Sequence, residues 1–283
     1  LARLVTAAQR EKELNLYSFE LVGDAGLIVS RSFKEKYGIN VNIITGRGAE
    51  FVERIRTEHR VGQVVGDLIQ ATPAHVRNLK ALGLSASLAN VPSIQEKNVW
   101  SVDPLILDID GHLIAHRYQT LPPLINTQLV KPSEEPKSYK DLLHERWEGK
   151  IADGDPKITS GAYTVFVTLM NHGDVDINFL RALGKQDIKY FSGIAEVIRA
   201  IAKGEHSIAL VGSLVNAKAF LDEGAPMKAL SMQEGTVVQV STIAGIKNAP
   251  HPNAAQLFVN WVMSREGQTI YTKPLGIFPV RKD

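Results

Sequence analysis

The sequence predicts an α/β protein composed of two units, and three observations support this prediction. The chain has 283 residues, a length that suits one large or two medium domains. Apolar runs of strand length alternate with amphipathic stretches of helix length, as in βαβ units with a mainly parallel sheet. Between residues 110 and 140 this alternation gives way to a segment punctuated by four prolines, and it then resumes. We therefore expect two α/β units with a junction near residues 115–125.

The first unit is predicted to contain three strands. They are expected at Glu13 to Phe19, Val41 to Thr45 and Asp67 to Gln70, where apolar runs have strand length. A stretch of helical character follows each strand, so the strands are expected to pair in parallel with helices on the faces of the sheet.

The helices of this unit are predicted from the spacing of apolar residues and from their end signals. Ala25 to Tyr37 places Leu27, Ile28 and Phe33 on its apolar side, and Gly38 provides the C-terminal stop. Gly48 to His59 is the second helix, and one of its faces carries Phe51, Val52 and Ile55. Pro73 opens the third helix, where its missing N–H costs nothing.

The remainder of the chain is interpreted in the same way. Leu105 to Gln119 is expected to form two extended pieces around Asp110-Gly111, a dipeptide typical of tight hairpins. The later strands and helices are expected at Lys150 to Ala152, Gly161 to Asn171, Ile194 to Lys203, Ser207 to Val211 and Asn253 to Arg265.

Composition excludes several classes of protein. Thirty-two Lys and Arg balance thirty Asp and Glu, so the net charge of +2 shows no basic bias, and we expect no nucleic-acid partner. The absence of cysteine excludes disulfides, thiolate metal sites and cysteine nucleophiles. No run approaches the roughly 18 apolar residues that a membrane helix requires.

The segment Asp155 to Ala162 (DPKITSGA) is the most suggestive motif for binding. It joins a strand to the start of an apolar helix, where free N–H groups and the helix dipole attract anions. Ser160 adds a hydroxyl donor, and Gly161 lets a ligand approach the backbone. The alternative interpretation is that Ser160 is only the N-cap of this helix and Gly161 a spacer.

A second glycine-containing loop, Thr45 to Phe51 (TGRGAEF), also joins a strand to a helix. It lacks the third glycine of the dinucleotide fingerprint and follows the second strand, so a nicotinamide cofactor is not expected. The guanidinium of Arg47 offers paired N–H donors to a carboxylate or phosphate. The alternative interpretation is that Arg47 is only a solvated arginine in a loop.

Other candidates are chosen by location, because ligands of open α/β sheets lie beyond the carboxyl ends of the strands. Ser18, Phe19 and Glu20 follow the first strand, and Thr72 follows the third. Catalytic signatures are absent: neither G-x-S-x-G nor H-E-x-x-H occurs, so no enzyme, metal site or cofactor is predicted.

Several segments, taken in order, resemble the ferric-iron-type branch of bacterial ABC-transporter extracellular solute-binding proteins. The resemblance is carried by Ile125-Asn126-Thr127, by Pro136 to Leu143 (PKSYKDLL) with Trp147 to Ile151 (WEGKI), by Ala200 to Glu205 (AIAKGE), by Gly224 to Pro226 (GAP) and by Ala249 to Ala255 (APHPNAA), which continues through Phe258, Trp261, Ser264, Glu266-Gly267-Gln268 and Tyr271.

The resemblance implies the two-lobed type 2 periplasmic binding protein fold, with a mainly parallel sheet flanked by helices in each lobe. Lobe one would comprise residues 1–117 and 240–283, and lobe two residues 118–239. Two hinge crossovers would lie near Tyr118-Gln119 and Gln239-Val240, and closure would trap a small-molecule solute between the lobes. The implied partner is an inner-membrane ABC permease, and the implied location is periplasmic, or extracellular and membrane-anchored for a lipoprotein. We expect a monomer.

The resemblance also bears on the ligand. Iron-binding members carry two adjacent tyrosines at positions that match Leu214 and Val215 here, which supply no phenolate, so the usual ferric site is not expected. Ser160-Gly161-Ala162 matches the family's anion-holding helix start, and Ser192-Gly193 offers another. The expected solute is an organophosphate, a phosphonate or a carboxylate. The complete set of predicted ligand-binding residues is Ser18, Phe19, Glu20, Arg47, Thr72, Thr159, Ser160, Gly161, Ala162, Tyr163, Ser192 and Ser213.

Two other functions remain open at this stage. The same fold serves as an effector-sensing domain in regulators, and it also binds ferric or metal complexes and polyols in other members. Turnover of a bound ligand would indicate an enzyme, whereas stoichiometric binding would indicate a transport component.

Overall fold

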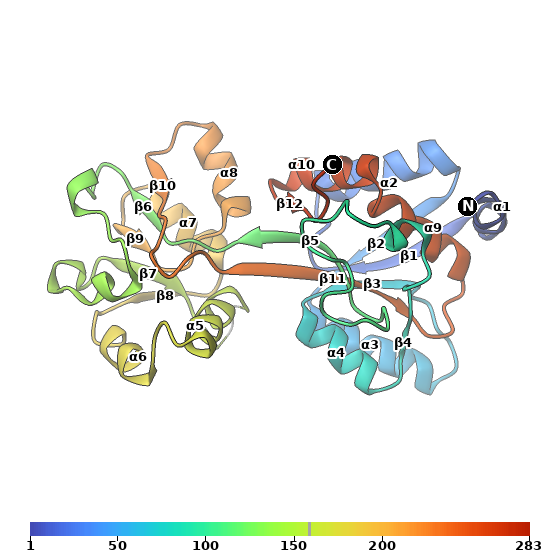
Figure 1. Ribbon diagram of the computed structural model, residues 1–283, viewed down its shortest axis with the longest axis horizontal. Helices are drawn as coiled ribbons and strands as arrows, with labels where there is room; N and C mark the ends of the chain where they lie inside the picture. The colour runs from blue at the N-terminus through green and yellow to red at the C-terminus, as the bar shows by residue number, and fades with distance from the viewer. Residues whose placement is uncertain (158–159) are drawn as a thin grey trace. The chain divides into compact units, whose positions relative to one another are not determined.

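The structure is a computed structural model that describes residues 1–157 and 160–283. The described residues form two compact units: unit 1 is Leu1–Tyr118 with Val240–Asp283, and unit 2 is Gln119–Gln239. Two strands, β5 (Ile114–Thr120) and β11 (Val238–Ile246), carry the chain out of unit 1 and back into it (Figure 1). No helix in the described part of the chain is long and apolar enough to cross a membrane.

Unit 1 is built on a mixed sheet with the strand order β12-β5-β11-β3-β1-β2, and β4 pairs with β11. Only β2, β1 and β3 pair in parallel, whereas β11 runs antiparallel to β3 and β12 runs antiparallel to β5. The sheet is thus less parallel than the alternation of strands and helices predicted, because its second half comes from the strands that join the units. The remaining strands are β1 (Glu13–Ser18), β2 (Asn40–Thr45), β3 (Leu68–Ala71), β4 (Ser85–Ala86) and β12 (Phe278–Pro279).

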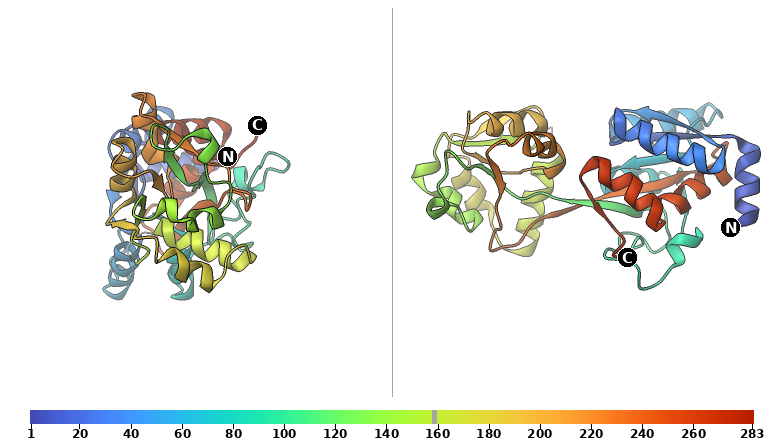
Figure 2. Two further views of the ribbon diagram at one scale, coloured as in Figure 1. Left: turned by 90° about the vertical axis from the view of Figure 1, so that its left-hand side faces the viewer. Right: turned by 90° about the horizontal axis from the view of Figure 1, so that it is seen from above.

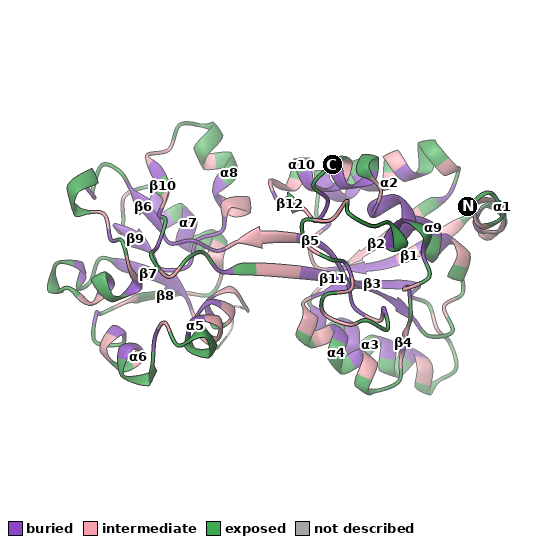
Figure 3. Ribbon diagram, viewed as in Figure 1, coloured by how far each residue is buried: buried purple, intermediate pink, exposed green. Residues whose placement is uncertain are grey.

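Helices cover both faces of this sheet. In Figure 1, α2 and α10 lie above it and α3 and α4 below it, and Figure 3 shows buried strands between helices whose outer faces are exposed. Phe33, Phe258 and Trp261 form one aromatic cluster of the core, and Tyr17 stacks on Phe51 in another. The helices are α1 (Ala2–Glu11), α2 (Asp24–Tyr37), α3 (Gly48–Arg60), α4 (Pro73–Ala81), α9 (Pro252–Val262) and α10 (Arg265–Leu275), with a 3₁₀ turn at Pro92–Gln95.

The buried face of α2 differs from the predicted one. Leu27 and Ile28 are exposed, and the buried residues besides Phe33 are Ala25, Gly26 and Val29. The reason lies at Gly26, where a Cβ atom would come within 2.8 Å of the Leu21 carbonyl oxygen. The face of α2 that contains Gly26 therefore packs against the segment that follows β1, and Leu27 and Ile28 lie on the exposed side.

The predicted hairpin around Asp110-Gly111 is wrong. Residues 103–111 form turns, and only the segment that becomes β5 is extended. Gly111 has a positive φ of 73°, and a Cβ atom there would lie 2.5 Å from the Ala89 nitrogen. Its carbonyl accepts a hydrogen bond from the Leu88 amide. The absence of a side chain at Gly111 therefore allows its loop to pack closely against the loop that contains Leu88 and Ala89.

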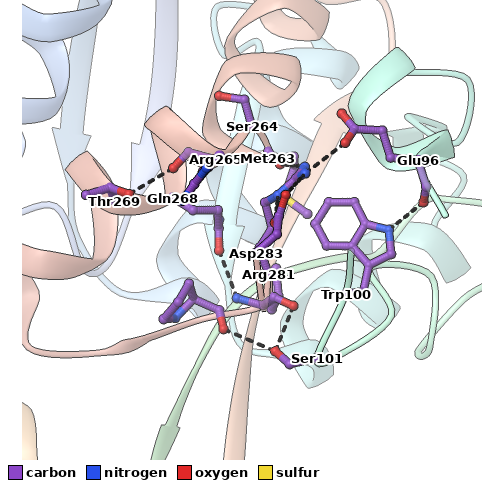
Figure 4. A network of polar contacts seen from close by, with 12 residues as sticks. Glu96, Trp100, Ser101, Met263, Ser264, Arg265, Gln268, Thr269, Arg281 and Asp283 are labelled. Carbon is purple, nitrogen blue, oxygen red and sulfur yellow. Dashed lines mark hydrogen bonds and ion pairs between the residues drawn. The ribbon is translucent and has the colours of Figure 1, made fainter. Parts of the chain in front are cut away.

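The predicted last helix ends earlier than expected, and a further helix follows it. α9 ends at Val262, and Ser264 then caps α10 by accepting a hydrogen bond from the Gly267 amide at 3.1 Å. Arg281 then holds the C-terminal tail in place (Figure 4): it pairs with Glu96 and Asp283, donates to the Met263 carbonyl and lies over the Trp100 ring.

Unit 2 contains a five-stranded mixed sheet with the order β10-β6-β9-β7-β8, in which β8, β7 and β9 pair in parallel. Consecutive residues of its strands belong to different apolar clusters: Ile125 and Ile151 to one, and Leu124 and Ala152 to the other. Both faces of the sheet are therefore covered. The elements are β6 (Leu124–Asn126), β7 (Ile151–Gly154), β8 (Lys189–Phe191), β9 (Ile208–Ala209), β10 (Met227–Ala229), α5 (Ser160–His172), α6 (Ile177–Leu183), α7 (Ile194–Ala202) and α8 (Leu214–Asp222), with 3₁₀ turns at Pro132–Glu134, Tyr139–Leu143 and Glu145–Trp147.

Candidate functional site

The candidate residues of unit 1 lie at one edge of its sheet. β1, β2 and β3 are parallel, and Ser18 pairs in register with Thr45 on β2 and with Gln70 on β3. The carboxyl ends of the three strands therefore meet, and the segments that contain Phe19, Arg47 and Thr72 leave the sheet at the same edge. This arrangement follows directly from the predicted βαβ units.

Two of these candidates are engaged inside unit 1. Ser18 is fully buried, and its hydroxyl donates to Gln70 at 2.7 Å and accepts from the Leu21 amide at 3.0 Å. The Glu20 carboxylate accepts hydrogen bonds from His116, Arg117, Ser241 and Tyr271, and only 5% of the side chain is exposed. Neither side chain has the free polar atoms that a solute contact requires.

The charge of Glu20 is held in place by its partners. Burial alone would raise the pKa of Glu20, but the Arg117 guanidinium and His116 outweigh it and hold the pKa well below its usual range. The carboxylate is thus ionised inside the unit, where an unpaired charge would be strongly destabilising.

Arg47 and Thr72 lie at the starts of two neighbouring helices. His75 connects these starts, because its ring packs against Gly48, where a Cβ atom would be 2.4 Å from Nδ1, while Thr72 Oγ1 lies 2.8 Å from the same nitrogen. Arg47 is the N-cap residue of α3, its side chain is 88% exposed, and its only ion-pair contact shown in the described residues is with Glu50, at 3.9 Å. Its guanidinium is therefore available to an anion. Phe19, half-buried, lies beneath the Arg117 guanidinium at 5.8 Å.

The candidate residues of unit 2 also gather at one edge. β8, β7 and β9 are parallel, and the chain leaves their carboxyl ends toward Ser192, toward α5 and toward Ser213. α5 begins at Ser160, and its first turn contains no acidic residue. The amide groups of this turn thus carry the positive end of the helix dipole with no acidic side chain in that turn to neutralise it. Thr159 lies outside the described residues.

Gly161, in the first turn of α5, has space beside its backbone. Apart from its chain neighbours and its own helix, the described residues would bring only the Val211 side chain within 4 Å of a Cβ atom there, at 3.8 Å, so these residues do not require a glycine. Ala162 is buried under the helix, whereas 61% of Tyr163 is exposed. Gly161 and Tyr163 are therefore accessible, and the Ala162 side chain is part of the core.

The two other serines of unit 2 have partners of their own. Ser213 is buried, caps α8 and accepts a hydrogen bond from Asn216 Nδ2 at 2.9 Å. Ser192 is exposed and donates to Glu196 at 2.9 Å. Because Glu196 lies in the first turn of α7, it offsets the dipole of that helix, and this start is a poorer anion site than that of α5.

Asp153, at the carboxyl end of β7, is not among the residues predicted from the sequence. Its side chain is fully buried, its Oδ1 accepts a hydrogen bond from the Gly154 amide at 2.8 Å, and its Oδ2 has no partner among the described residues. Burial raises the pKa of Asp153 to about 8. The group is therefore mostly neutral at pH 7, and it adds little negative charge to this edge of the sheet. No local sequence signal distinguishes it from a turn aspartate.

The described residues contain no group of three or more His, Asp or Glu side chains arranged to hold a metal ion. Leu214 and Val215, where the sequence resemblance placed the missing iron-binding tyrosines, are the first two residues of α8, and that placement stays a prediction. They offer only aliphatic carbon to a ligand.

The comparisons with known proteins identify the family. A profile of the bacterial extracellular solute-binding proteins matches residues 29–283. The chain belongs to this family. The family binds solutes and does not catalyse reactions, in agreement with the absence of catalytic signatures in the sequence.

Two curated relatives illustrate the range of the family. An uncharacterized protein of Haemophilus influenzae is 30% identical over 169 residues, which are 58% of this chain and 49% of that protein. The match thus spans about half the length of that relative. A putative 2-aminoethylphosphonate-binding periplasmic protein of Salmonella typhimurium is 22% identical over 260 residues, covering 89% of this chain and 73% of the relative.

Solved structures show the same fold. A ferric binding protein from Campylobacter jejuni matches with a TM-score of 0.80 and 21% identity, over 95% of this chain and 87% of that one. The periplasmic binding protein AfuA from Actinobacillus pleuropneumoniae, with fructose-6-phosphate bound, matches with a TM-score of 0.75 and 22% identity, over 95% and 85%. These likenesses confirm the predicted α/β two-lobed periplasmic binding protein fold.

Proposed function

We propose that this protein is the solute-binding component of an ABC importer, and that it captures a small anionic solute and delivers it to a membrane permease. The observation that carries the proposal is the start of α5, at the carboxyl ends of the parallel strands β7, β8 and β9, where the first turn contains no acidic residue and Gly161 leaves room beside the backbone. Arg47 in unit 1 adds an exposed guanidinium with little competition from its own neighbours.

The solute class follows from these groups. Amide N–H groups and a guanidinium fork both fit a phosphate, a phosphonate or a carboxylate. Two relatives agree with this class, since one is named for 2-aminoethylphosphonate and another holds fructose-6-phosphate. Phe19 and the exposed Tyr163 are suited to an apolar or sugar part of the solute.

A thermal-shift panel tests the proposal. It contains 2-aminoethylphosphonate, fructose 6-phosphate, inorganic phosphate, citrate, ferric citrate, glucose and spermidine. A ligand present at 100 times its Kd stabilises the folded state by about 2.7 kcal/mol, which raises the melting temperature of a chain of this size by several degrees. A shift confined to the phosphorus-containing compounds or citrate supports the proposal. A shift only with glucose, spermidine or ferric citrate refutes the anionic solute.

Arg47→Ala then tests the contribution of unit 1 to affinity. Loss of a charged hydrogen bond is expected to weaken binding of the active anion by about 1.5–3 kcal/mol, or roughly 10- to 150-fold, in isothermal titration. Arg56→Ala is the matched control, because Arg56 lies on the same helix and pairs with Glu53. Equal affinity of the Arg47 variant and the wild type would remove Arg47 from the site.

A further inference from the structure

The Glu20 cluster is a group of buried polar residues that the solute site does not use. It consists of Glu20, His116, Arg117, Ser241 and Tyr271, all in unit 1. One carboxylate oxygen, Oε1, accepts from His116 Nε2 at 2.7 Å and from the Tyr271 hydroxyl. The other, Oε2, accepts from Arg117 Nε at 2.7 Å, from Arg117 Nη2 and from Ser241 Oγ at 3.0 Å.

The members of the Glu20 cluster come from elements that are far apart in the sequence. Glu20 lies in the segment after β1, His116 and Arg117 lie on β5, Ser241 lies on β11 and Tyr271 lies on α10. Unit 1 ends at Tyr118 and resumes at Val240, so Glu20 holds both joining strands within two residues of the unit boundary. These strands are neighbours in the sheet and leave unit 1 next to each other (Figure 2).

A second contact from α10 holds the same residues of β5. Gln268, labelled in Figure 4, donates to the His116 carbonyl at 2.9 Å and accepts from the Val280 amide at 2.8 Å. The joining strands are thus held to the helix layer through side chains, in addition to their own ladder of backbone hydrogen bonds.

The strength of this arrangement comes from burial. The side chains of His116, Glu20 and Arg117 are 0%, 5% and 7% exposed, so solvent screens their interactions weakly. Removing the carboxylate charge would leave the Arg117 guanidinium buried without a counter-ion, which is far more costly than the loss of one hydrogen bond. On the unit 2 side of the boundary the strands are linked by a neutral pair, Gln119 Nε2 to Gln239 Oε1 at 2.6 Å.

We propose that Glu20 is a positioning residue for solute capture: it does not contact the solute, but fixes β5, β11 and the segment that carries Phe19 as one rigid piece of unit 1. The strands then bend or twist beyond residue 118 and before residue 240, and not inside unit 1. Phe19, which lies against Arg117, is held in the same piece. The role in solute capture rests on the proposed function, whereas the anchoring of the strands does not.

Hydrogen exchange of the ligand-free protein tests the anchoring, with Glu20→Gln compared with Glu58→Gln. Glu58 is the matched control, because it is also buried in unit 1 but bonds to Tyr17, Arg54 and the amides of Val65 and Gly66, none of which lies on β5 or β11. Glu20→Gln is expected to speed exchange about tenfold or more in residues 114–118 and 240–243, with little change there in the control. Equal effects of the two variants, or no effect of Glu20→Gln, would overturn the proposal.

A double variant separates the anchor from general destabilisation. If Glu20 acts by holding Arg117, Glu20→Gln combined with Arg117→Gln removes both charges and destabilises the protein less than the sum of the single variants. Additive effects would argue against this coupling. Glu20→Gln should also bind 2-aminoethylphosphonate or fructose 6-phosphate about tenfold more weakly than Glu58→Gln. If the wild type binds neither probe, the anionic solute is refuted, while the exchange result decides the anchor on its own.

Discussion

At the scale of single residues, Asp153 is a buried carboxyl group with a strongly raised pKa. It is fully buried, one of its oxygens has no partner among the described residues, and burial raises its pKa to about 8. In the unfolded chain the same carboxyl has an ordinary pKa near 4. The folded state therefore retains a proton that the unfolded state has lost over the whole interval between these two values.

This difference predicts a pH dependence of stability. Because the folded state binds the additional proton, the free energy of unfolding should fall as the pH rises from about 4 to about 8, and the contribution should level off above that. Asp153→Asn keeps the shape of the side chain without the titration, so its stability should fall less over this interval. Urea unfolding at pH 5, 6.5 and 8 measures the difference, with the exposed Asp110→Asn as control. Parallel pH profiles of the wild type and Asp153→Asn would contradict the prediction.

Gly161 provides a second prediction at this scale. Its backbone is helical, and an added methyl group has room against Val211, so Gly161→Ala should keep or raise stability by up to about 1 kcal/mol. The same methyl group blocks the approach of an anion to the amides, so the affinity for the active phosphorus compound should fall about tenfold. Gly184→Ala, at the right-handed end of α6, is the control for both measurements. Unchanged affinity in Gly161→Ala would place the anion elsewhere.

The candidate residues show what local sequence can predict about a site. The carboxyl edges of the two sheets were predictable, because strand order along the chain and parallel pairing place Ser18, Arg47 and Thr72 together. Their roles were not predictable in the same way. From the sequence alone, Glu20 has no recognisable partner and was predicted to bind the solute. Its partners Arg117 and Tyr271 lie 97 and 251 positions away along the chain and are close to it only in the folded protein.

At the scale of elements, α9 is held by a residue from another helix. Glu11, the last residue of α1, accepts hydrogen bonds from the Asn253 side chain at 2.6 Å and from the Ala254 amide at 2.7 Å. The carboxylate satisfies the free N–H groups of the first turn of α9 and lies at the positive end of its dipole.

Removal of this cap has a predictable cost. Glu11→Ala should lower the free energy of unfolding by about 1–2 kcal/mol, the usual range for a helix cap with a favourable charge. Arg10→Ala, an exposed change on the same helix, should alter it by less than about 0.5 kcal/mol. Guanidinium unfolding followed by circular dichroism compares the two, and equal stabilities would show that Asn253 and Ala254 find other acceptors.

The elements also show where periodicity stops being informative. The strands and helices from β1 to α4 in unit 1 were predicted within a few residues, because each has a strong apolar pattern, whereas α6 and β8 of unit 2 were not predicted. α10 was missed because its buried residues are Gly267, Gln268, Tyr271 and Thr272, which give no apolar periodicity. The hairpin failed at Gly111 because a positive-φ glycine is required equally by a tight turn and by the close contact with Ala89.

At the scale of the whole molecule, the order of family motifs along the chain predicted the fold, whereas the ligand depends on a few positions. The side chains of Leu214 and Val215 provide no oxygen for ferric iron, and the described residues contain no group of three or more His, Asp or Glu side chains arranged to hold a metal ion. We therefore expect the melting temperature with ferric citrate to equal that with sodium citrate within about 1 °C, whereas an additional bound ligand in excess would shift it by several degrees. A larger shift with ferric citrate than with sodium citrate would show that iron binds by another route.

The passage of the chain through β5 and β11 also sets the order in which the protein is completed during synthesis. β11 lies between β3 and β5 in the sheet of unit 1, yet it is made only after all 121 residues of unit 2, from Gln119 to Gln239. At a ribosomal rate of about 5–20 residues per second, this interval lasts on the order of ten seconds. During that time the elements of unit 2 are made one after another, while β3 has an open edge and α9 and α10 do not yet exist. Unit 1 begins before unit 2 but is completed after it, and until then the open edge of β3 is exposed to pairing with other strands.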